Sequence, residues 1–478
     1  MSTVHNVDVA ILGAGTAGLS ARRAAKANGA SVVMIDPGPF GTTCARVGCM
    51  PSKLLIAAAE AAHHVHQAPM FGVNAAPPEI DGPAVMRRVQ SERDRFVCFV
   101  GESIDAIDEA GELIRERATV MGPGHLVAGD HDVHFRTLVV ATGTVPFTPP
   151  PFRGLGDALL TNDGIFELAD LPESLLVVGL GVIGLELGQA FHRLGVRTTL
   201  VGVGGTVGPL SDPEVTRSAI EVLGAELDMH PDYTLNSIES VDGGVCLDFV
   251  DSAGVHRVET YERVLMAAGR STTLGKLGLE TLGVEPVGRN DWGIHADTLQ
   301  LQDAAVFIAG DVNGLHPLLH EASDDGKVAG ANAATFPNVV STARRTSLAV
   351  VFSDPQIGIV GTAYSGLKSC SGVVGEVDYS DQGRARVAGM NAGLVRIYAD
   401  LSGVLIGAEL FGPRVEHLSH LLAWAVQQKL TVEQALAMPF YHPVVEEGIR
   451  TALRDLLTNL QRGQKVKCTQ QPELVPGC

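Results

Sequence analysis

The chain has 478 residues, of which 45% are apolar, 19% are charged and 55 are glycine. This balance is typical of a folded α/β protein and excludes a disordered or fibrous chain. Acidic residues outnumber basic ones by 54 to 35, which gives a net charge of -19 and argues against nucleic acid or an anionic membrane as the main partner. A chain of this length predicts three or four domains.

The sequence carries no signal for export or membrane insertion. The first eight residues have no cationic flank, and no uninterrupted apolar run reaches the length of a membrane span. Seven cysteines are too few for the disulfide scaffold of a secreted protein. We therefore expect a cytoplasmic protein, in which a close pair of cysteines is more plausibly catalytic than structural.

The first predicted unit is a strand, a glycine-rich turn, a helix and a second strand, within residues 7–36. Its turn has the dinucleotide-binding spacing, with Gly13, Gly15 and Gly18. These glycines permit a tight turn and a close approach of a pyrophosphate to the helix N-terminus. Asp36, at the end of the second strand, can accept a hydrogen bond from a ribose hydroxyl.

Cys44 and Cys49 follow this unit directly. The four residues between them allow a loop to bring the two sulfurs to bonding distance, and a helix expected to begin near Pro51 favours a thiolate at Cys49. A pair of buried thiols or an incidental disulfide would have the same spacing. Zinc is disfavoured because no second close pair of cysteines occurs. The position after a nucleotide unit favours thiol-disulfide chemistry beside a cofactor.

A second strand-turn-helix-strand unit occupies residues 174–201. It repeats the glycine spacing with Gly179, Gly181 and Gly184. The residue 23 positions after its first glycine is Gly202, where the first unit has an acid, and no arginine follows through Pro209. The pattern predicts a second nucleotide site and favours NADH, with NADPH left open, because Arg197 or a residue from elsewhere can take the missing role.

Five further motifs complete the pattern. They are Ala141-Thr142-Gly143, Gly269-Arg270, a buried strand ending in Asp311, a helix that contains His320, and His442-Pro443 followed by Glu447. Together with the glycine turns and the stretch from Gly41 to Lys53, their order resembles that of the flavin-dependent disulfide reductases over residues 5–460. Within that family the chain is most similar to the dihydrolipoamide dehydrogenase branch, beside glutathione reductase and mercuric reductase.

The resemblance implies an α/β fold with two Rossmann-like dinucleotide-binding domains, for FAD and NAD(P), and a C-terminal α+β dimerisation domain of a homodimer. The implied domains are an FAD-binding domain with the redox cysteines over 1–155, an NAD(P)-binding domain over 156–270, a central segment returning to FAD over 271–343, the dimerisation domain over 344–460 and a flexible tail over 461–478.

The resemblance also implies the residues that bind the cofactors FAD and NAD, with NADP not excluded. These residues are Gly13, Gly15, Gly18, Asp36, Thr43, Lys53, Thr142, Gly143, Gly179, Gly181, Gly184, Gly202, Gly269, Arg270, Asp311 and His320.

The catalytic roles come from the same resemblance. Cys44 exchanges with the substrate and Cys49 contacts the flavin. Lys53 shares a helix face with Cys49 and pairs with Glu186 near the reactive flavin ring nitrogen. The implied reaction is the oxidation of dihydrolipoamide, or of a protein-bound lipoyl group, by NAD.

His442 is the expected proton carrier, because thiol exchange needs a base for the attacking sulfur and an acid for the leaving one. Glu447 would hold its tautomer. By the resemblance this pair serves the active site of the other subunit. A 2-oxo acid dehydrogenase complex is the larger assembly that the resemblance permits.

Four residues depart from the family pattern and leave the substrate open: Thr42, Arg46, Gln356 and Val444. An added cation at Arg46, beside Cys44, would lower thiol pKa values and favour an anionic disulfide. The alternatives are reduction of another small disulfide or a metal ion, as in glutathione or mercuric reductase, and flavin-only quinone or diaphorase activity. A non-catalytic flavin-bound interaction protein is least favoured.

We predict no metal site in the chain. His316 and His320 fit packing against the flavin, and His63, His64 and His66 fit a solvated helix face. Cys468 and Cys478 near the C-terminus are interpreted as incidental thiols, with a second redox pair as the alternative.

Overall fold

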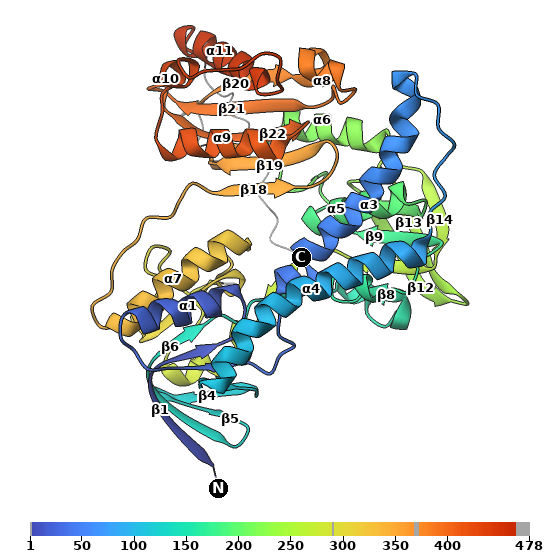
Figure 1. Ribbon diagram of the computed structural model, residues 1–478. Helices are drawn as coiled ribbons and strands as arrows, with labels where there is room; N and C mark the ends of the chain where they lie inside the picture. The colour runs from blue at the N-terminus through green and yellow to red at the C-terminus, as the bar shows by residue number, and fades with distance from the viewer. Residues whose placement is uncertain (1, 289–290, 368–371, 465–478) are drawn as a thin grey trace. The chain divides into compact units, whose positions relative to one another are not determined.

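A computed structural model describes residues 2–288, 291–367 and 372–464 (Figure 1). Its contacts divide the chain into two compact units. Unit 1 comprises Met1–Pro51, Arg88–Phe147 and Arg270–Arg344, and unit 2 comprises Ser52–Arg87, Thr148–Gly269 and Arg345–Cys478. This division interleaves segments that the sequence analysis treats as consecutive domains, and the predicted domain boundaries stay a prediction. Cys370, Cys468 and Cys478 lie outside the described residues.

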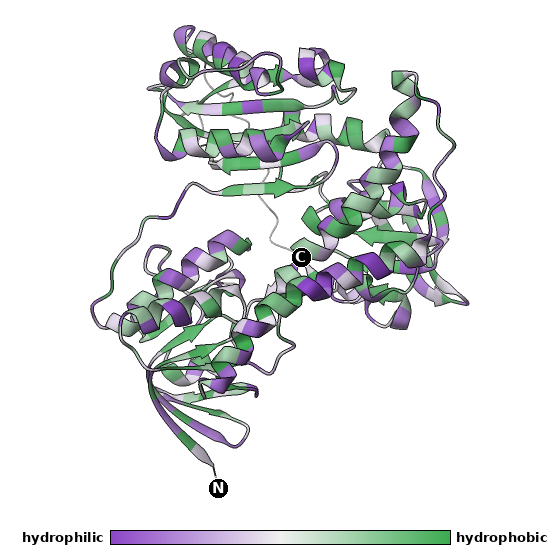
Figure 2. Ribbon diagram, in the orientation of Figure 1, coloured by the Kyte–Doolittle hydropathy of each residue, from purple (hydrophilic) through white to green (hydrophobic). Residues whose placement is uncertain are grey.

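Unit 1 is built on a seven-stranded sheet with the order β3-β2-β1-β6-β5-β4, and β17 pairs with β6. The strands β3, β2, β1, β6 and β17 are parallel, whereas β5 and β4 continue antiparallel. The C-terminal end of β1, from Val9 to Leu12, is buried, as a strand covered on both faces requires, and this part of the sheet is hydrophobic in Figure 2. The bounds are β1 Thr3–Leu12, β2 Val32–Ile35, β3 Leu113–Ile114, β4 Ala118–Gly122, β5 His125–Ala128, β6 His131–Val140 and β17 Val306–Ile308.

Helices α1 (Thr16–Ala27) and α7 (Leu319–Thr335) lie side by side against this sheet (Figure 1). A side chain at Gly326 or Gly330 of α7 would place its Cβ 2.2 Å from a backbone oxygen of α1. The absence of side chains there lets the two backbones meet. The remaining regular elements of unit 1 are α2 Thr43–Val47, β7 Thr144–Pro146 and β16 Arg270–Thr272, and α4 Gly82–Glu109 begins in unit 2 and ends in unit 1.

Unit 2 contains a parallel sheet with the order β11-β10-β9-β15-β8, followed by an antiparallel meander of β12, β13 and β14. Helix α5 joins β9 to β10, and α6 joins β10 to β11. The bounds are β8 Leu159–Leu160, β9 Ser174–Val178, α5 Val182–Arg193, β10 Arg197–Val201, α6 Pro213–Gly224, β11 Asp228–His230, β12 Thr234–Val241, β13 Gly244–Val250, β14 His256–Tyr261 and β15 Arg263–Met266.

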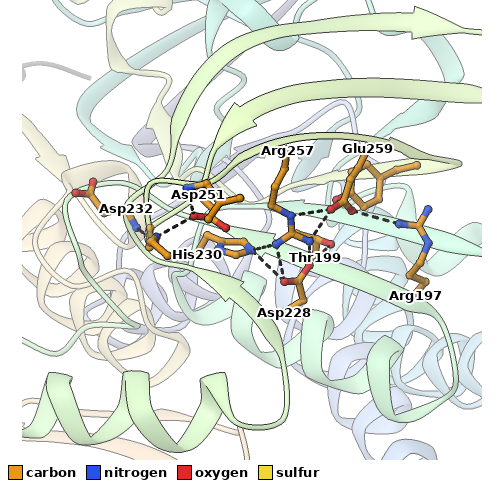
Figure 3. A network of polar contacts seen from close by, with 12 residues as sticks. Arg197, Thr199, Asp228, His230, Asp232, Asp251, Arg257 and Glu259 are labelled. Atoms are coloured by element: carbon orange, nitrogen blue, oxygen red, sulfur yellow. Dashed lines mark hydrogen bonds and ion pairs between the residues drawn. The ribbon is translucent and has the colours of Figure 1, made fainter.

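A polar network fastens the meander to the parallel sheet (Figure 3). Arg257 of β14 donates to both carboxylate oxygens of Asp228 in β11 at 2.9 Å. Burial opposes ionisation of Asp228, but hydrogen bonds from His230, Arg257 and Thr199 lower its pKa below the usual range. The bidentate pair therefore connects β14 of the meander to β11 of the parallel sheet with a fixed geometry.

A third sheet of unit 2 is antiparallel, with the order β18-β19-β22-β21-β20. Glu409 of β22 is fully buried and accepts hydrogen bonds from the backbone N–H groups of Ser211, Asp212 and Tyr364. This carboxylate joins the sheet to the residues that precede α6. The bounds are β18 Leu348–Val351, β19 Gln356–Gly361, β20 Gly372–Asp378, α8 Gly383–Val387, β21 Leu394–Asp400, β22 Leu405–Gly412, α9 Val415–Gln427, α10 Val432–Leu436 and α11 Glu447–Gln461.

The predicted fold class is confirmed, because two sheets with a parallel core and glycine-rich turns are accompanied by an antiparallel C-terminal sheet with helices. The helix after the cysteines differs from expectation, since α3 (Cys49–Gln67) begins two residues before Pro51. Proline is tolerated in a first turn, where its missing N–H has no helical partner. No helix among the described residues is long and apolar enough to cross a membrane.

Candidate active site

In the first glycine turn, two of the three glycines leave no room for a Cβ atom and one leaves room for it. A Cβ at Gly13 would lie 2.3 Å from the carbonyl oxygen of Ala141, and one at Gly18 would lie 1.9 Å from that of Gly13. A Cβ at Gly15 would meet nothing within 4 Å. Two of the glycines therefore pack strand, turn and helix together, while the third leaves room for a ligand.

The turn also presents hydrogen-bond donors and a fixed carboxylate. Gly15 is the N-cap of α1, whose first turn has no side-chain cap and no acidic residue. Asp36 accepts from the N–H of Ala14 at 2.6 Å and from that of Gly38 at 2.7 Å. Its remaining lone pairs can accept from a ribose hydroxyl, and the open helix N-terminus suits a pyrophosphate. These residues fit the adenosine and pyrophosphate groups of FAD.

Several predicted flavin residues follow adjacent strands at the same edge of this sheet. Val140 of β6 pairs with Leu12 of β1 and with Ile308 of β17, so the segments after these strands lie together. Gly143, which has a φ of 63°, and Asp311 belong to these segments. Burial raises the pKa of Asp311, and the positive charge of Arg270 opposes this increase.

The other predicted residues of this region have definite local contacts. Arg270 donates to the carbonyl and the hydroxyl oxygen of Thr144, each at 2.8 Å. The hydroxyl oxygens of Thr142 and Thr273 are 2.8 Å apart. Gly269 has a φ of 106° and precedes β16, whereas His320 is exposed in the first turn of α7.

The redox loop contains two helices. Cys44 is half-buried in the short helix α2, Gly48 ends that helix, and the exposed Cys49 opens α3. The sequence analysis did not predict α2. Thr43 is its exposed first residue.

Helix α2 changes the expectation for Arg46. Two residues in a helix are separated by about 200° around its axis, so Arg46 projects from the face opposite to Cys44. Its Nε is buried without a hydrogen-bond partner among the described residues. The hypothesis of an anionic substrate requires the Arg46 guanidinium and the Cys44 sulfur to lie on the same helix face. In α2 they lie on opposite faces.

Thr42, a departure from the family pattern, has an unusual backbone conformation. Its φ and ψ are 60° and 151°, a region populated almost only by glycine. Its hydroxyl accepts from the N–H of Ala45 at 3.3 Å and so caps α2. The threonine gains a cap at the cost of backbone strain.

Lys53 of α3 and Glu186 of α5 form the predicted ion pair within unit 2. Nζ lies 2.8 and 2.7 Å from the two carboxylate oxygens, and only 3% of Glu186 is exposed. The N–H of Phe352 donates to this carboxylate at 3.0 Å and the hydroxyl of Ser52 at 3.3 Å. Nζ also lies 4.5 Å from the ring centroid of Phe352, a cation-π contact. Ser52 and Phe352 were not among the predicted site residues, and the folded chain brings both of them to the pair.

The second glycine turn repeats the geometry of the first. A Cβ at Gly179 would lie 2.4 Å from the oxygen of Ala267, and one at Gly184 would lie 1.9 Å from that of Gly179. A Cβ at Gly181, the uncapped N-cap of α5, would meet nothing within 4 Å. These residues fit a second dinucleotide.

The region after β10 differs from its counterpart after β2. A Cβ at Gly202 would lie 2.9 Å from Cγ of Leu180, so an apolar side chain occupies the place of an acid. Two residues further, the N–H of Gly204 donates to Asp232 at 3.0 Å. Asp232 follows the neighbouring strand β11, and the sequence analysis missed it because only strand pairing brings it here.

His442 and Glu447 come together as a hydrogen-bonded pair. Nδ1 of the imidazole lies 2.9 Å from one carboxylate oxygen of Glu447, and Arg450 donates to the other at 3.0 Å. The side chain of His442 is 80% exposed. The contact uses Nδ1, which leaves Nε2 available to exchange a proton with a substrate. Arg450 was missed, although its spacing of three residues on a helix is a signal for such a contact.

Comparison with known proteins decides the family. Residues 7–326 match the pyridine nucleotide-disulphide oxidoreductase family, and residues 347–453 match its dimerisation domain. The chain belongs to this family. Pyridine nucleotide-disulphide oxidoreductases are flavin-dependent enzymes that use FAD and NAD(H), which agrees with the two glycine turns.

Named relatives of this oxidoreductase cover nearly its whole length. A dihydrolipoyl dehydrogenase of Halobacterium salinarum is 30% identical over 94% of this chain and 96% of its own. A mercuric reductase of Streptomyces lividans is 30% identical over 95% of this chain and 97% of its own. The crystal structure of LpdA from Mycobacterium tuberculosis has a TM-score of 0.77 and 26% identity, covering 95% of this chain and 99% of that one.

Substitution of Thr42 by glycine tests the strain in the redox loop. We expect T42G to raise the free energy of unfolding of the holoenzyme by about 1 kcal/mol, because the backbone strain is relieved and glycine is itself an acceptable N-cap. T216G, inside α6 and away from the cofactor-binding residues, is the control and lowers stability through its helix propensity. Urea unfolding measures both, and a loss of stability in T42G would contradict the assignment of strain.

The buried pair can be tested by removing one charge and then both. K53M leaves the carboxylate of Glu186 buried without its cation, so we expect a stability loss of about 2 to 3 kcal/mol. The double variant K53M/E186Q recovers at least part of this loss because no uncompensated charge remains. Urea unfolding of the holoenzyme measures the difference.

The ion pair of Lys327 and Asp324, whose carboxylate is 29% exposed against 4% for that of Glu186, provides the control for this cycle. K327M is expected to change stability by less than about 0.5 kcal/mol. Equal losses in K53M and the double variant would show that the charge of Glu186 is not the source of the effect.

Proposed function

We propose that this oxidoreductase is a dihydrolipoamide dehydrogenase, which oxidises dihydrolipoamide or a protein-bound lipoyl group with NAD. The observation that carries the proposal is the imidazole of His442, held through Nδ1 by Glu447. Exchange between an organic dithiol and a protein disulfide needs such a proton carrier.

The proposed residue roles follow the atoms of the exchange. A substrate thiolate attacks the sulfur of Cys44 in the oxidised pair, which breaks the Cys44–Cys49 bond and leaves Cys49 as a thiolate. The second substrate thiolate then closes the substrate disulfide and releases Cys44. His442 accepts the protons lost by the two substrate thiols, one in each half of the exchange. Net, one proton is released to solvent, and one would be taken up with the electron pair that forms the hydride of NADH. When bound, FAD carries electrons from the thiols to NAD.

Glu447 and Arg450 act as positioning residues in this proposal. Glu447 accepts from Nδ1–H of the histidine, which fixes the tautomer with Nε2 as the base and stabilises the imidazolium once Nε2 is protonated. Arg450 holds the second oxygen of the same carboxylate. In the homodimer implied by the dimerisation domain, the pair serves the active site of the other subunit.

A pair of assays separates dithiol chemistry from flavin chemistry. We expect H442A to lower kcat/KM for dihydrolipoamide about 10²- to 10⁴-fold and to leave NADH-dependent quinone reduction almost unchanged, because only the first reaction needs the proton carrier. C44S should behave in the same way. H420A, an exposed histidine of the same sheet-and-helix region, is the control and leaves both activities intact.

Two outcomes would contradict the proposed substrate. Equal loss of both activities in H442A would contradict the proposed role of His442 in proton transfer. Turnover of oxidised glutathione or Hg²⁺ by the wild type, without turnover of dihydrolipoamide, would keep the disulfide mechanism and move the substrate to one of the alternatives.

We infer that Asp232 supplies the acid that Gly202 lacks, so that NADH is preferred to NADPH. The carboxylate is tied to Gly204 directly beyond β10, where the ribose of a dinucleotide binds. A carboxylate accepts from the 2'-hydroxyl of NADH and repels the 2'-phosphate of NADPH. Asp232 is exposed, which leaves it accessible to the ribose.

Direct binding measurements test this role. D232A should weaken NADH binding about tenfold, because a hydrogen bond to a charged group is lost, and should leave NADPH binding unchanged or improve it. D242A, in an exposed turn of the same unit, is the matched control. Fluorescence titration gives both dissociation constants, and equal effects of D232A on both cofactors would contradict selective recognition of the ribose.

We further propose assembly with a 2-oxo acid dehydrogenase core and a cytoplasmic location. The support is the similarity to dihydrolipoyl dehydrogenases together with the net charge of -19, which permits docking on a basic surface.

A further inference from the structure

Three metal-ligating side chains meet on the antiparallel hairpin of β5 and β6, in unit 1. They are His125, Asp132 and His134. His125 is the direct cross-strand partner of His134, and Asp132 lies two residues before His134 on the same strand. Because strand side chains alternate in direction, all three project from one face of the hairpin.

The donor atoms of this cluster converge on one point. Nε2 of His125 is 2.7 Å and Nε2 of His134 is 3.5 Å from the same oxygen of Asp132. The three ligand atoms lie within 4.8 Å of one another, and the two imidazole rings stack with centroids 5.0 Å apart. Their side chains are 32% to 49% exposed, so an ion can reach them from solvent.

This donor set matches the requirements of a first-row transition metal. Bonds of about 2.0 to 2.2 Å in a tetrahedral site place neighbouring donors about 3.3 to 3.6 Å apart. Nε2 of His134 already lies 3.5 Å from the Asp132 oxygen, whereas Nε2 of His125 is hydrogen-bonded to it at 2.7 Å and has to move outward by less than about 1 Å to bind an ion. Imidazole nitrogen and carboxylate oxygen are ligands of Zn²⁺. One carboxylate and two neutral imidazoles together carry a single negative charge, which partly neutralises a divalent cation. Water can fill the fourth position.

We propose that His125, Asp132 and His134 form a binding site for a divalent transition-metal ion such as Zn²⁺. The site lies on the antiparallel strands β5 and β6 of the first nucleotide-binding sheet and takes no part in the proposed thiol chemistry. The sequence analysis predicted no metal site because the ligands are separated by the hairpin turn, and only the register of β5 and β6 joins them.

A second histidine pair on the same sheet provides an internal comparison. Nε2 of His5 lies 2.9 Å from Nδ1 of His131, and these residues face the opposite side of β6. Among the residues that the structure describes, this pair has no third ligand within the limits of a metal cluster. His131 therefore serves as a matched control on the same strand.

The test measures Zn²⁺ binding by isothermal titration calorimetry. The holoenzyme is used with Cys44 and Cys49 oxidised, so that their thiolates do not compete, and after dialysis against a chelator. We expect one Zn²⁺ per chain. H125A, D132N and H134A should each weaken binding at least about tenfold, whereas H131A should leave it within about twofold.

Thermal unfolding provides a second readout. Zn²⁺ should raise the melting temperature of the wild type and of H131A, and this increase should disappear in D132N and H134A, because an ion that binds only the folded state stabilises it. The proposal is overturned by a wild type that binds no Zn²⁺, or by stoichiometric binding that the three ligand variants leave intact. Unchanged melting temperatures of the variants without Zn²⁺ show that they fold.

Discussion

The carboxylate of Glu186 is the interaction that holds three separate segments of unit 2 together. It is buried in α5 and collects donors from two distant segments, Lys53 and Ser52 of α3 and the backbone of Phe352 after β18. A charge in this position is tolerated only while these donors remain in place. The Glu186 side chain thus links three elements: the nucleotide-binding helix α5, the helix α3 that begins at the redox pair, and the segment after β18 in the C-terminal sheet.

The sequence specified those features that depend on local spacing. The glycine turns, the strands and helices around them and the link between His442 and Glu447 could be predicted because each lies within one short segment. Contacts that require strand register or helix packing could not be predicted. Asp232, Phe352 and the cluster at His134 are of this kind.

Local conformation also altered two interpretations. Arg46 was expected beside Cys44, but the short helix α2 turns the two side chains to opposite faces. In the sequence Thr42 is a departure from the family pattern, and in the structure its φ of 60° makes it a strained position within the redox loop. Neither effect is visible in residue types, because both depend on where a five-residue helix begins and ends.

The buried carboxylate of Glu409 has a mechanical consequence. It binds the amides of Ser211 and Asp212, which precede α6, to the middle of the antiparallel sheet. These bonds lie in a fully buried place, where breaking them exposes a charge to an apolar interior. Because Glu409 holds these two amides, the segment that leads from β10 into α6 is fastened to β22, and loss of this carboxylate would free the start of α6 from the C-terminal sheet.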